Sequence, residues 1–275
     1  MISMKKQRSF VLSLLFILVQ YTLAAQQLAP DSQLLKNIPY YEIDNEDAYI
    51  RDRCLLDIFI PAAKKEFPTV VWFHGGGLTG GEKFVPDRLL NKGIAVVSVN
   101  YRLNPKVTSP AYIEDAAAAT AWVFRNIEKY GGDTKKIIIA GHSAGGYLAM
   151  MIGLDRKWLA RHNIESDNIF LLVPFSGHTI THMTVRKERG IPDTQPTVDE
   201  MAPLFHVRQD APPLHLITGD RDLEMLGRYE ENAYMWRMMT VAGHKHTYLY
   251  ELNGFNHGEM AEPAFDLLLK IIHNQ

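Results

Sequence analysis

The chain has 275 residues, of which 47% are hydrophobic and 22% are charged, and its formal net charge is −2. This composition is that of a globular protein with a substantial core and excludes an intrinsically disordered chain. Because no basic run occurs after the first eight residues, the sequence also argues against nucleic acid as a partner.

The N-terminal segment has the pattern of a secretory signal peptide. Three cations within the first eight residues precede a mostly apolar stretch at residues 10–23, and the small residues Ala24 and Ala25 follow it. The apolar stretch is shorter than the roughly 20 residues that span a bilayer, although an uncleaved anchor is the alternative. We therefore predict a signal peptide at residues 1–25, and an exported domain at residues 26–275 that is periplasmic or secreted and has no stable membrane association after cleavage.

Short apolar runs rich in Val, Ile and Leu follow one another along the chain and are predicted to be strands. Such runs are typical of strands that are buried on both faces of a parallel sheet. They are Leu55–Ile60, Thr69–Phe73, Ile94–Asn100, Ile137–Ala140, Ile169–Val173, Leu214–Thr218 and Thr247–Leu252. Residues 26–50 are polar and are expected to be irregular.

Helical segments fall between these runs. The predicted helices are Ala111–Tyr130, Gly145–Leu154, Arg228–Ala242 and Ala261–His273. The alternation predicts an α/β fold with a doubly wound, mostly parallel sheet and helices on both faces. In such sheets, binding and catalytic sites form at the carboxyl ends of the strands.

Residues 155–213 depart from this alternation, because they carry several histidines and prolines and show little periodicity. We expect part of this stretch to form a small lid or a pocket wall over the carboxyl edge of the sheet. A separate domain is the less favoured interpretation.

The pattern G-x-S-x-G occurs at Gly141 to Gly145, directly after the apolar run that ends at Ala140. It predicts a strand that turns sharply into a helix, with glycines where a Cβ would clash. Ser143 would then stand above the sheet edge, where a substrate carbonyl can reach its hydroxyl. Since a free serine is a weak nucleophile, this chemistry needs a neighbouring base.

Among the eleven histidines, His257 is the predicted base. It lies in a glycine-bounded loop, Gly254 to Gly258, between the last predicted strand and the last predicted helix. An imidazole titrates near neutrality, so it can take the serine proton and then deliver it to the leaving group.

The acid that orients the imidazole is expected just after the strand that ends at Thr218. Asp220 and Asp222 both occur there, and we favour Asp222, because Asp220 beside Gly219 is placed to stabilise the turn itself. Asp220 stays open as the alternative acid, and Glu224 is a more distant third candidate.

An oxyanion needs N–H donors, and two segments can supply them. Ala144 opens the helix that follows the nucleophile, so its amide is well placed for one donor. Gly75, Gly76 and Gly77 follow another predicted strand and let the backbone approach the oxygen closely. His74, which opens the glycine run, is expected to brace that loop rather than move protons.

Other chemistries find little support in the sequence. The single cysteine, Cys54, excludes an intramolecular disulfide and a cysteine metal cluster, and is expected to be a small buried residue. There is no H-E-x-x-H motif, no phosphate-binding glycine loop and no His/Asp cluster with ligand spacing. We therefore predict no metal and no cofactor. The sequence does not indicate an oligomeric state.

Taken together, these motifs resemble the hormone-sensitive-lipase-like group of α/β-hydrolases, near the bacterial carboxylesterases of the acetyl and feruloyl esterase type. The resemblance runs from about residue 50 to the end. The segments that carry it are His74 to Gly77, Asn100 to Leu103, Gly141 to Gly146, Gly219 to Asp222, and His257 with Gly258. It implies Ser143 as nucleophile, His257 as base, Asp222 as acid, and oxyanion donors from the glycine loop and Ala144.

The predicted function is that of an exported serine esterase acting on small-molecule or oligosaccharide esters, with acetylated or feruloylated polysaccharide fragments as possible substrates. The same residues could instead cleave an amide, such as an aryl formamide, or a peptide bond. From another class, the chain could be a binding module that kept the hydrolase fold and lost turnover. Acyl and alcohol specificity is not indicated by the sequence.

Overall fold

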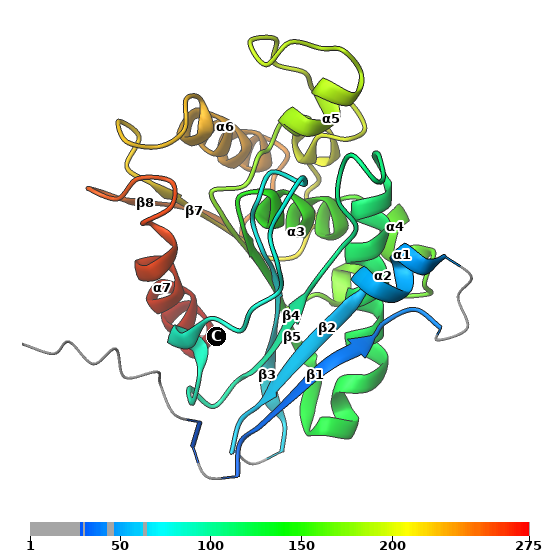
Figure 1. Cartoon of the computed structure of the whole chain (residues 1–275). Helices are drawn as coiled ribbons and strands as arrows, with labels where there is room; N and C mark the ends of the chain where they lie inside the picture. Colours follow the sequence, from blue (N-terminus) through cyan, green and yellow to red (C-terminus); the bar gives the residue numbers. More distant parts are fainter. Residues whose placement is uncertain (1–27, 30, 43–46, 63–64, 275) are drawn as a thin grey trace, which may run out of the picture.

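An eight-stranded sheet forms the centre of the computed structural model, which describes residues 28–29, 31–42, 47–62 and 65–274 (Figure 1). The strands are β1 (Gln33–Pro39), β2 (Leu55–Ile60), β3 (Phe67–Phe73), β4 (Ala95–Val99), β5 (Gly132–His142), β6 (Leu171–Phe175), β7 (Leu214–Gly219) and β8 (Thr247–Leu252). Their order is β1-β2-β4-β3-β5-β6-β7-β8. The pairs β1–β2 and β2–β4 are antiparallel, and all the others are parallel. The predicted signal peptide at residues 1–25 lies outside the described residues.

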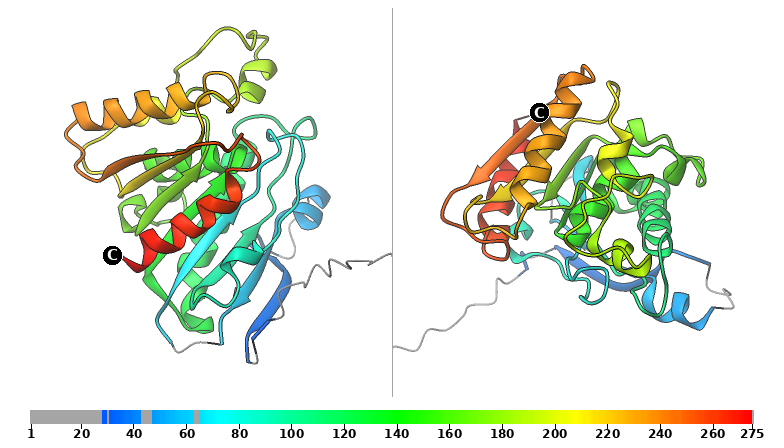
Figure 2. Two further views of the ribbon diagram at one scale, coloured as in Figure 1. Left: turned by 90° about the vertical axis from the view of Figure 1, so that its left-hand side faces the viewer. Right: turned by 90° about the horizontal axis from the view of Figure 1, so that it is seen from above.

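Helices cover both faces of this sheet, as the doubly wound prediction requires (Figure 2). The α-helices are α1 (Ala48–Arg53), α2 (Ala111–Asn126), α3 (Ala144–Leu154), α4 (Lys157–Ala160), α5 (Met183–Glu188), α6 (Arg228–Val241) and α7 (Ala261–His273). Short 3₁₀ turns are η1 (Asp87–Leu89), η2 (Ile127–Tyr130), η3 (Ser166–Asn168) and η4 (Pro203–His206). Among the described parts of the chain, no helix has both the length and the apolar character needed to cross a bilayer.

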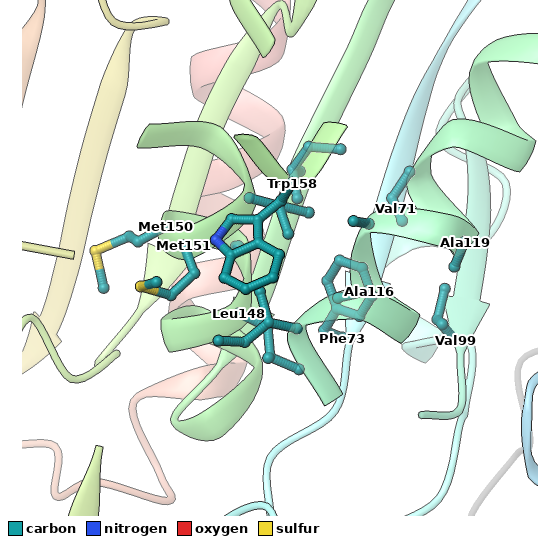
Figure 3. Packing of buried hydrophobic residues seen from close by; sticks show 14 of the residues in the cluster. Val71, Phe73, Val99, Ala116, Ala119, Leu148, Met150, Met151 and Trp158 are labelled. Atoms are coloured by element: carbon teal, nitrogen blue, oxygen red, sulfur yellow. The ribbon is translucent and has the colours of Figure 1, made fainter. Parts of the chain in front are cut away.

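Alternate side chains of the central strands enter two separate cores. In β3, Val71 and Phe73 pack with α2 and α3, whereas Val70 and Trp72 pack with α7. Figure 3 shows Val71 and Phe73 near Ala116 and Ala119 of α2. The sheet is therefore buried on both faces, which explains why its strands read as continuous apolar runs.

The interpretation of residues 26–50 as irregular is wrong for two elements. Residues 33–39 form β1, an edge strand, and the six-residue helix α1 begins at Ala48. The backbone of β1 is held by antiparallel pairing with β2, and its side chains are mostly exposed or half-buried, so no apolar run marks it. Asp47 caps α1 by accepting a hydrogen bond from the Tyr49 backbone N–H at 2.8 Å.

The segment between β6 and β7 carries α5 and η4 and lies at the carboxyl end of the parallel strands (Figure 1). Helix α5 is tied to the core by Glu188, which accepts hydrogen bonds from the Asn104 side chain, the Ser109 backbone N–H and the Tyr112 hydroxyl. Thr184 donates from its hydroxyl to the carbonyl oxygen of Gly77. This segment is thus anchored directly to the glycine loop at the sheet edge.

Replacing Gly145 by alanine is expected to lower the free energy of unfolding by roughly 3 kcal/mol or more. An added Cβ would overlap the carbonyl group of Phe73 and lie 2.8 Å from the carbonyl oxygen of His74. Neither backbone group can move without disrupting β3. Chemical denaturation of Gly145→Ala beside Gly80→Ala, where the nearest atom to an added Cβ is 4.0 Å away, tests this, and equal stabilities would contradict it.

Candidate active site

Ser143 lies at a strained turn between β5 and α3. Its backbone angles are φ 54° and ψ −113°, a conformation that non-glycine residues rarely adopt. The Ser143 N–H donates to the carbonyl oxygen of Phe175 at 2.8 Å, and the Ser143 carbonyl accepts from the Tyr147 N–H at 3.0 Å. The side chain is partly exposed at the sheet edge. This is the strand-to-helix turn that the G-x-S-x-G pattern predicts.

His257 follows β8 and pairs with a carboxylate. Its Nδ1 lies 2.8 Å from Oε2 of Glu224, whose side chain is 1% exposed, whereas the His257 side chain is 20% exposed. A buried carboxylate at Nδ1 fixes the tautomer in which Nε2 is free to accept a proton. The pair therefore has the arrangement of a general base and its orienting acid.

The carboxylate that contacts His257 is that of Glu224 and not that of Asp222, which corrects the prediction from the sequence. The Asp222 side chain is exposed, and its backbone N–H donates to Oδ1 of Asp220 at 3.0 Å. After β7, the Asp220 carbonyl accepts from the N–H groups of Leu223 and Glu224, which closes a tight turn. That turn directs Asp222 outward and carries Glu224 back toward His257.

Asp220 has the supporting role expected of it. Its Oδ2 accepts from the Gly254 N–H at 2.7 Å, and its own N–H donates to the Phe255 carbonyl at 2.8 Å. Asp220 thus joins the turn after β7 to the loop that carries His257. The distance between the two loops is set by these bonds.

Glu224 is held in its ionised form. Although burial opposes ionisation, hydrogen bonds from His257, Ser176 and the Gly219 N–H lower the pKa of Glu224 from 4.5 to about 2. Because the pKa is lower in the folded state, the carboxylate adds stability above about pH 4.5, and that contribution is lost as the pH falls through about 2.

The difference in unfolding free energy between the wild type and Glu224→Gln should therefore shrink between pH 4.5 and pH 2. Parallel denaturation series across this range, at constant ionic strength, would measure the difference. Titrating groups common to both proteins cancel in the comparison. A difference that is constant across the window would contradict the assigned ionisation.

His142, the residue before Ser143, braces the His257 loop. Its Nε2 lies 2.8 Å from the carbonyl oxygen of His257, and the two rings are 4.8 Å apart. Burial and the neighbouring His257 lower the pKa of His142 to about 4, so its ring is neutral near neutral pH. Contact with a carbonyl oxygen requires the tautomer that carries the proton on Nε2. This bond places Ser143 and His257 on adjoining chain segments.

The glycine loop passes directly beside Ser143. A Cβ on Gly75 would lie 3.5 Å from Cβ of Ser143, so the loop backbone approaches the serine closely. Gly76 and Gly77 have φ values of 111° and 64°, which favour glycine. Ala144 is the first residue of α3, where the helix N-terminus leaves N–H groups without helical partners. These positions are compatible with the predicted oxyanion donors.

His74 braces this loop through a buried cation that the sequence did not reveal. The His74 ring stacks on Tyr101 at 4.5 Å, and its Nδ1 lies 2.6 Å from the Gly75 carbonyl oxygen. Its Nε2 lies 3.3 Å from Arg53, which also donates to the carbonyl oxygens of Gly81 and Tyr101. Burial and Arg53 lower the pKa of His74 to about 4, which keeps it neutral. His74 is thus a support, as expected, and not a proton carrier.

Two observations concern other chemistries. Across the described residues, no group of three or more His, Cys, Asp or Glu side chains is arranged to hold a metal ion. Cys54 is 1% exposed, and burial together with the negative charge of Asp115 raises the pKa of its thiol to about 12. A thiol in this state is a packing residue, which confirms the expectation for it.

Comparisons with known proteins identify the family of the chain. A family model described as BD-FAE matches residues 56–226. Esterase LipC of Mycobacterium tuberculosis is 31% identical over 229 residues, which cover 77% of this chain and 53% of LipC. The chain thus spans about half the length of this curated relative.

Solved structures of esterases share the fold. A truncated carbohydrate esterase from gut microbiota has a TM-score of 0.72 at 21% identity, covering 90% of this chain and 98% of that one. An esterase from Pyrobaculum calidifontis has a TM-score of 0.64 at 26% identity, covering 79% of each chain.

Proposed function

Since the chain belongs to the BD-FAE family of hormone-sensitive-lipase-like α/β-hydrolases, we propose that it is a serine esterase that hydrolyses carboxylic esters through an acyl-enzyme on Ser143. The observation that carries this proposal is that Ser143 occupies a strained turn whose preceding residue, His142, contacts the loop of the His257–Glu224 pair. The esterase names of the relatives support it.

The proposed reaction uses these groups in turn. The Ser143 hydroxyl attacks the ester carbonyl while Nε2 of His257 takes the hydroxyl proton. The N–H groups of Ala144 and of the glycine loop stabilise the oxyanion that develops on the carbonyl oxygen. The C–O bond to the alcohol then breaks, and His257 gives its proton to the departing alkoxide.

Water completes the cycle by the same route. His257 removes a proton from a water molecule, which attacks the acyl carbonyl, and the Ser143 oxygen leaves with the proton. Throughout, Glu224 remains ionised and stabilises the positive charge on His257. No bond forms to His257 or Glu224.

For the substrate and location, we propose acyl groups on polysaccharide fragments and export to the periplasm or the medium. The first is supported by the likeness to a carbohydrate esterase, and the second by the cationic and apolar pattern of residues 1–25. The substrate and the location are more specific proposals than the esterase activity. Either could be wrong while the esterase activity holds.

A substrate panel tests these proposals in order. The purified wild type and Ser143→Ala would be assayed on p-nitrophenyl acetate, methyl ferulate, acetylated xylan fragments and an aryl formamide. Ser143-dependent ester hydrolysis is the expected result, with acetate released from xylan if the polysaccharide proposal holds. Turnover of the formamide alone would mean an amidase, and failure of a fluorophosphonate probe to label Ser143 would mean a catalytically silent hydrolase fold.

A further inference from the structure

Ser176 lies where strand β6 ends, and its hydroxyl reaches both partners of the charged pair. The hydroxyl donates to Oε1 of Glu224 at 2.6 Å and lies 3.0 Å from Nδ1 of His257. The residue is completely buried. Oε2 of Glu224 faces His257, whereas Oε1 accepts hydrogen bonds from the Ser176 hydroxyl and from the Gly219 N–H at 3.0 Å.

The backbone of Ser176 is fixed as firmly as its side chain. Its N–H donates to the Ile217 carbonyl at 2.7 Å, and its carbonyl oxygen accepts from the buried guanidinium of Arg228. Its φ is 46°, in the left-handed region that serine seldom occupies. Strain of this kind persists where the surroundings impose it, and it is concentrated at functional sites.

The preceding residue extends these contacts to the nucleophile. Phe175 accepts the Ser143 N–H with its carbonyl oxygen at 2.8 Å. The dipeptide Phe175–Ser176 therefore contacts the nucleophile backbone, the acid and the base at once. These three groups come from three separate segments: the end of β5, the turn after β7 and the loop after β8.

We propose that Ser176 is a positioning residue of the active site, which sets the orientation of Glu224 and thereby that of His257; the proposal rests on the proposed esterase function. The hydroxyl donates to Oε1 together with the Gly219 N–H, and so helps to hold the other oxygen, Oε2, against Nδ1 of His257. This hydrogen bond also stabilises the negative charge of Glu224, and it thereby weakens the attraction between that carboxylate and a protonated His257. No proton leaves Ser176 during the reaction.

The charged and titratable groups around the pair come from several elements. Glu224 precedes α6, Arg228 is the first residue of α6, and His142 ends β5. The pKa of His142 is lowered mainly by burial and further by the charges of His257 and Arg228. These groups remain in place in a Ser176 variant, so a change in the pH profile of that variant reports on the hydroxyl.

The test is Ser176→Ala, compared with Ser98→Ala. Ser98 on β4 is also completely buried, and among the described residues its hydroxyl has no hydrogen-bond partner, so the control removes the same atom without a contact. For p-nitrophenyl acetate we expect Ser176→Ala to lower kcat about 10-fold with little change in KM, the order expected for one charge-assisted hydrogen bond. The acid limb of its kcat/KM profile should move to higher pH, whereas Ser98→Ala should match the wild type.

Two further measurements make the outcome decisive. Ser176→Gly, which removes the hydroxyl and relieves the strained φ, should show the same shift of the acid limb, because the shift depends on the hydroxyl and not on the backbone. An unshifted profile in both variants, with or without a loss of rate, would overturn the proposal. Fluorophosphonate labelling of the wild type at Ser143 distinguishes this failure from failure of the esterase assignment, in which no labelling would occur.

Discussion

Replacing Ser143 by alanine is expected to lower kcat for p-nitrophenyl acetate by about 10⁴- to 10⁶-fold, because nucleophile and base act as a unit and neither works without the other. The fold should persist, since the backbone bonds from the Ser143 N–H to Phe175 and from the Tyr147 N–H to Ser143 do not involve the removed hydroxyl. Alanine at φ 54° is no more strained than serine.

Three measurements on Ser143→Ala separate chemistry from structure. Steady-state kinetics gives the rate loss, circular dichroism and the denaturation midpoint report the fold, and a fluorophosphonate probe reports the nucleophile. We expect loss of rate and of labelling with an unchanged midpoint. If more than about one hundredth of the wild-type rate remained in a preparation free of contaminating esterase, another group would be the nucleophile.

Most of the sheet could be predicted from the sequence, because burial on both faces produces apolar runs that are independent of distant partners. The predicted bounds of β2 and β8 agree with the structure, and those of β7 differ by one residue. β1 could not be recognised in this way. It is an edge strand whose side chains are exposed or half-buried, so it has no apolar run. Its extended backbone depends on pairing with β2, which lies about 20 residues further along the chain.

The positions of Ser143, His257 and the glycine loop at the sheet edge could be predicted from local motifs, because each lies in a turn with glycine neighbours. The identity of the acid depends on a longer stretch of backbone. Whether Asp222 or Glu224 faces His257 is decided by the turn after β7, in which the Asp220 carbonyl accepts two N–H groups and reverses the chain. The motif favours Asp222, which is the fourth residue of Gly219–Asp222, whereas the geometry favours Glu224. Only the turn distinguishes the two acids.

Ser176 and Arg53 left no signal of this kind. Serine and arginine are common residue types, and no motif marks these two. Their contacts become visible only in the folded chain, where Ser176 reaches Glu224 and Arg53 reaches His74. The predicted strand that ends at Val173 lies only three residues before Ser176, and this position near the carboxyl edge was the available clue. Residues that follow each parallel strand merit inspection even where no motif marks them.

The choice of acid leads to the second large effect, which is expected for Glu224→Gln. A glutamine amide can donate to Nδ1 of His257, which would favour the tautomer with the proton on Nε2, and that nitrogen could then no longer accept the Ser143 proton. We expect kcat to fall by about 10³- to 10⁴-fold with KM close to that of the wild type.

Asp222→Asn is the matched control for Glu224→Gln, since it makes the same carboxylate-to-amide change two residues away, on an exposed side chain. Its kcat should stay within about a factor of two of the wild type, because surface changes of this kind have small effects. Asp220→Asn should lie between the two, because it weakens the bond to the Gly254 N–H that holds the His257 loop without removing the charge that faces the imidazole. If Asp222→Asn lost the activity and Glu224→Gln kept it, the turn after β7 would have to rearrange in solution so that Asp222 reaches Nδ1 of His257, and the pairing with Glu224 would not be the catalytic one.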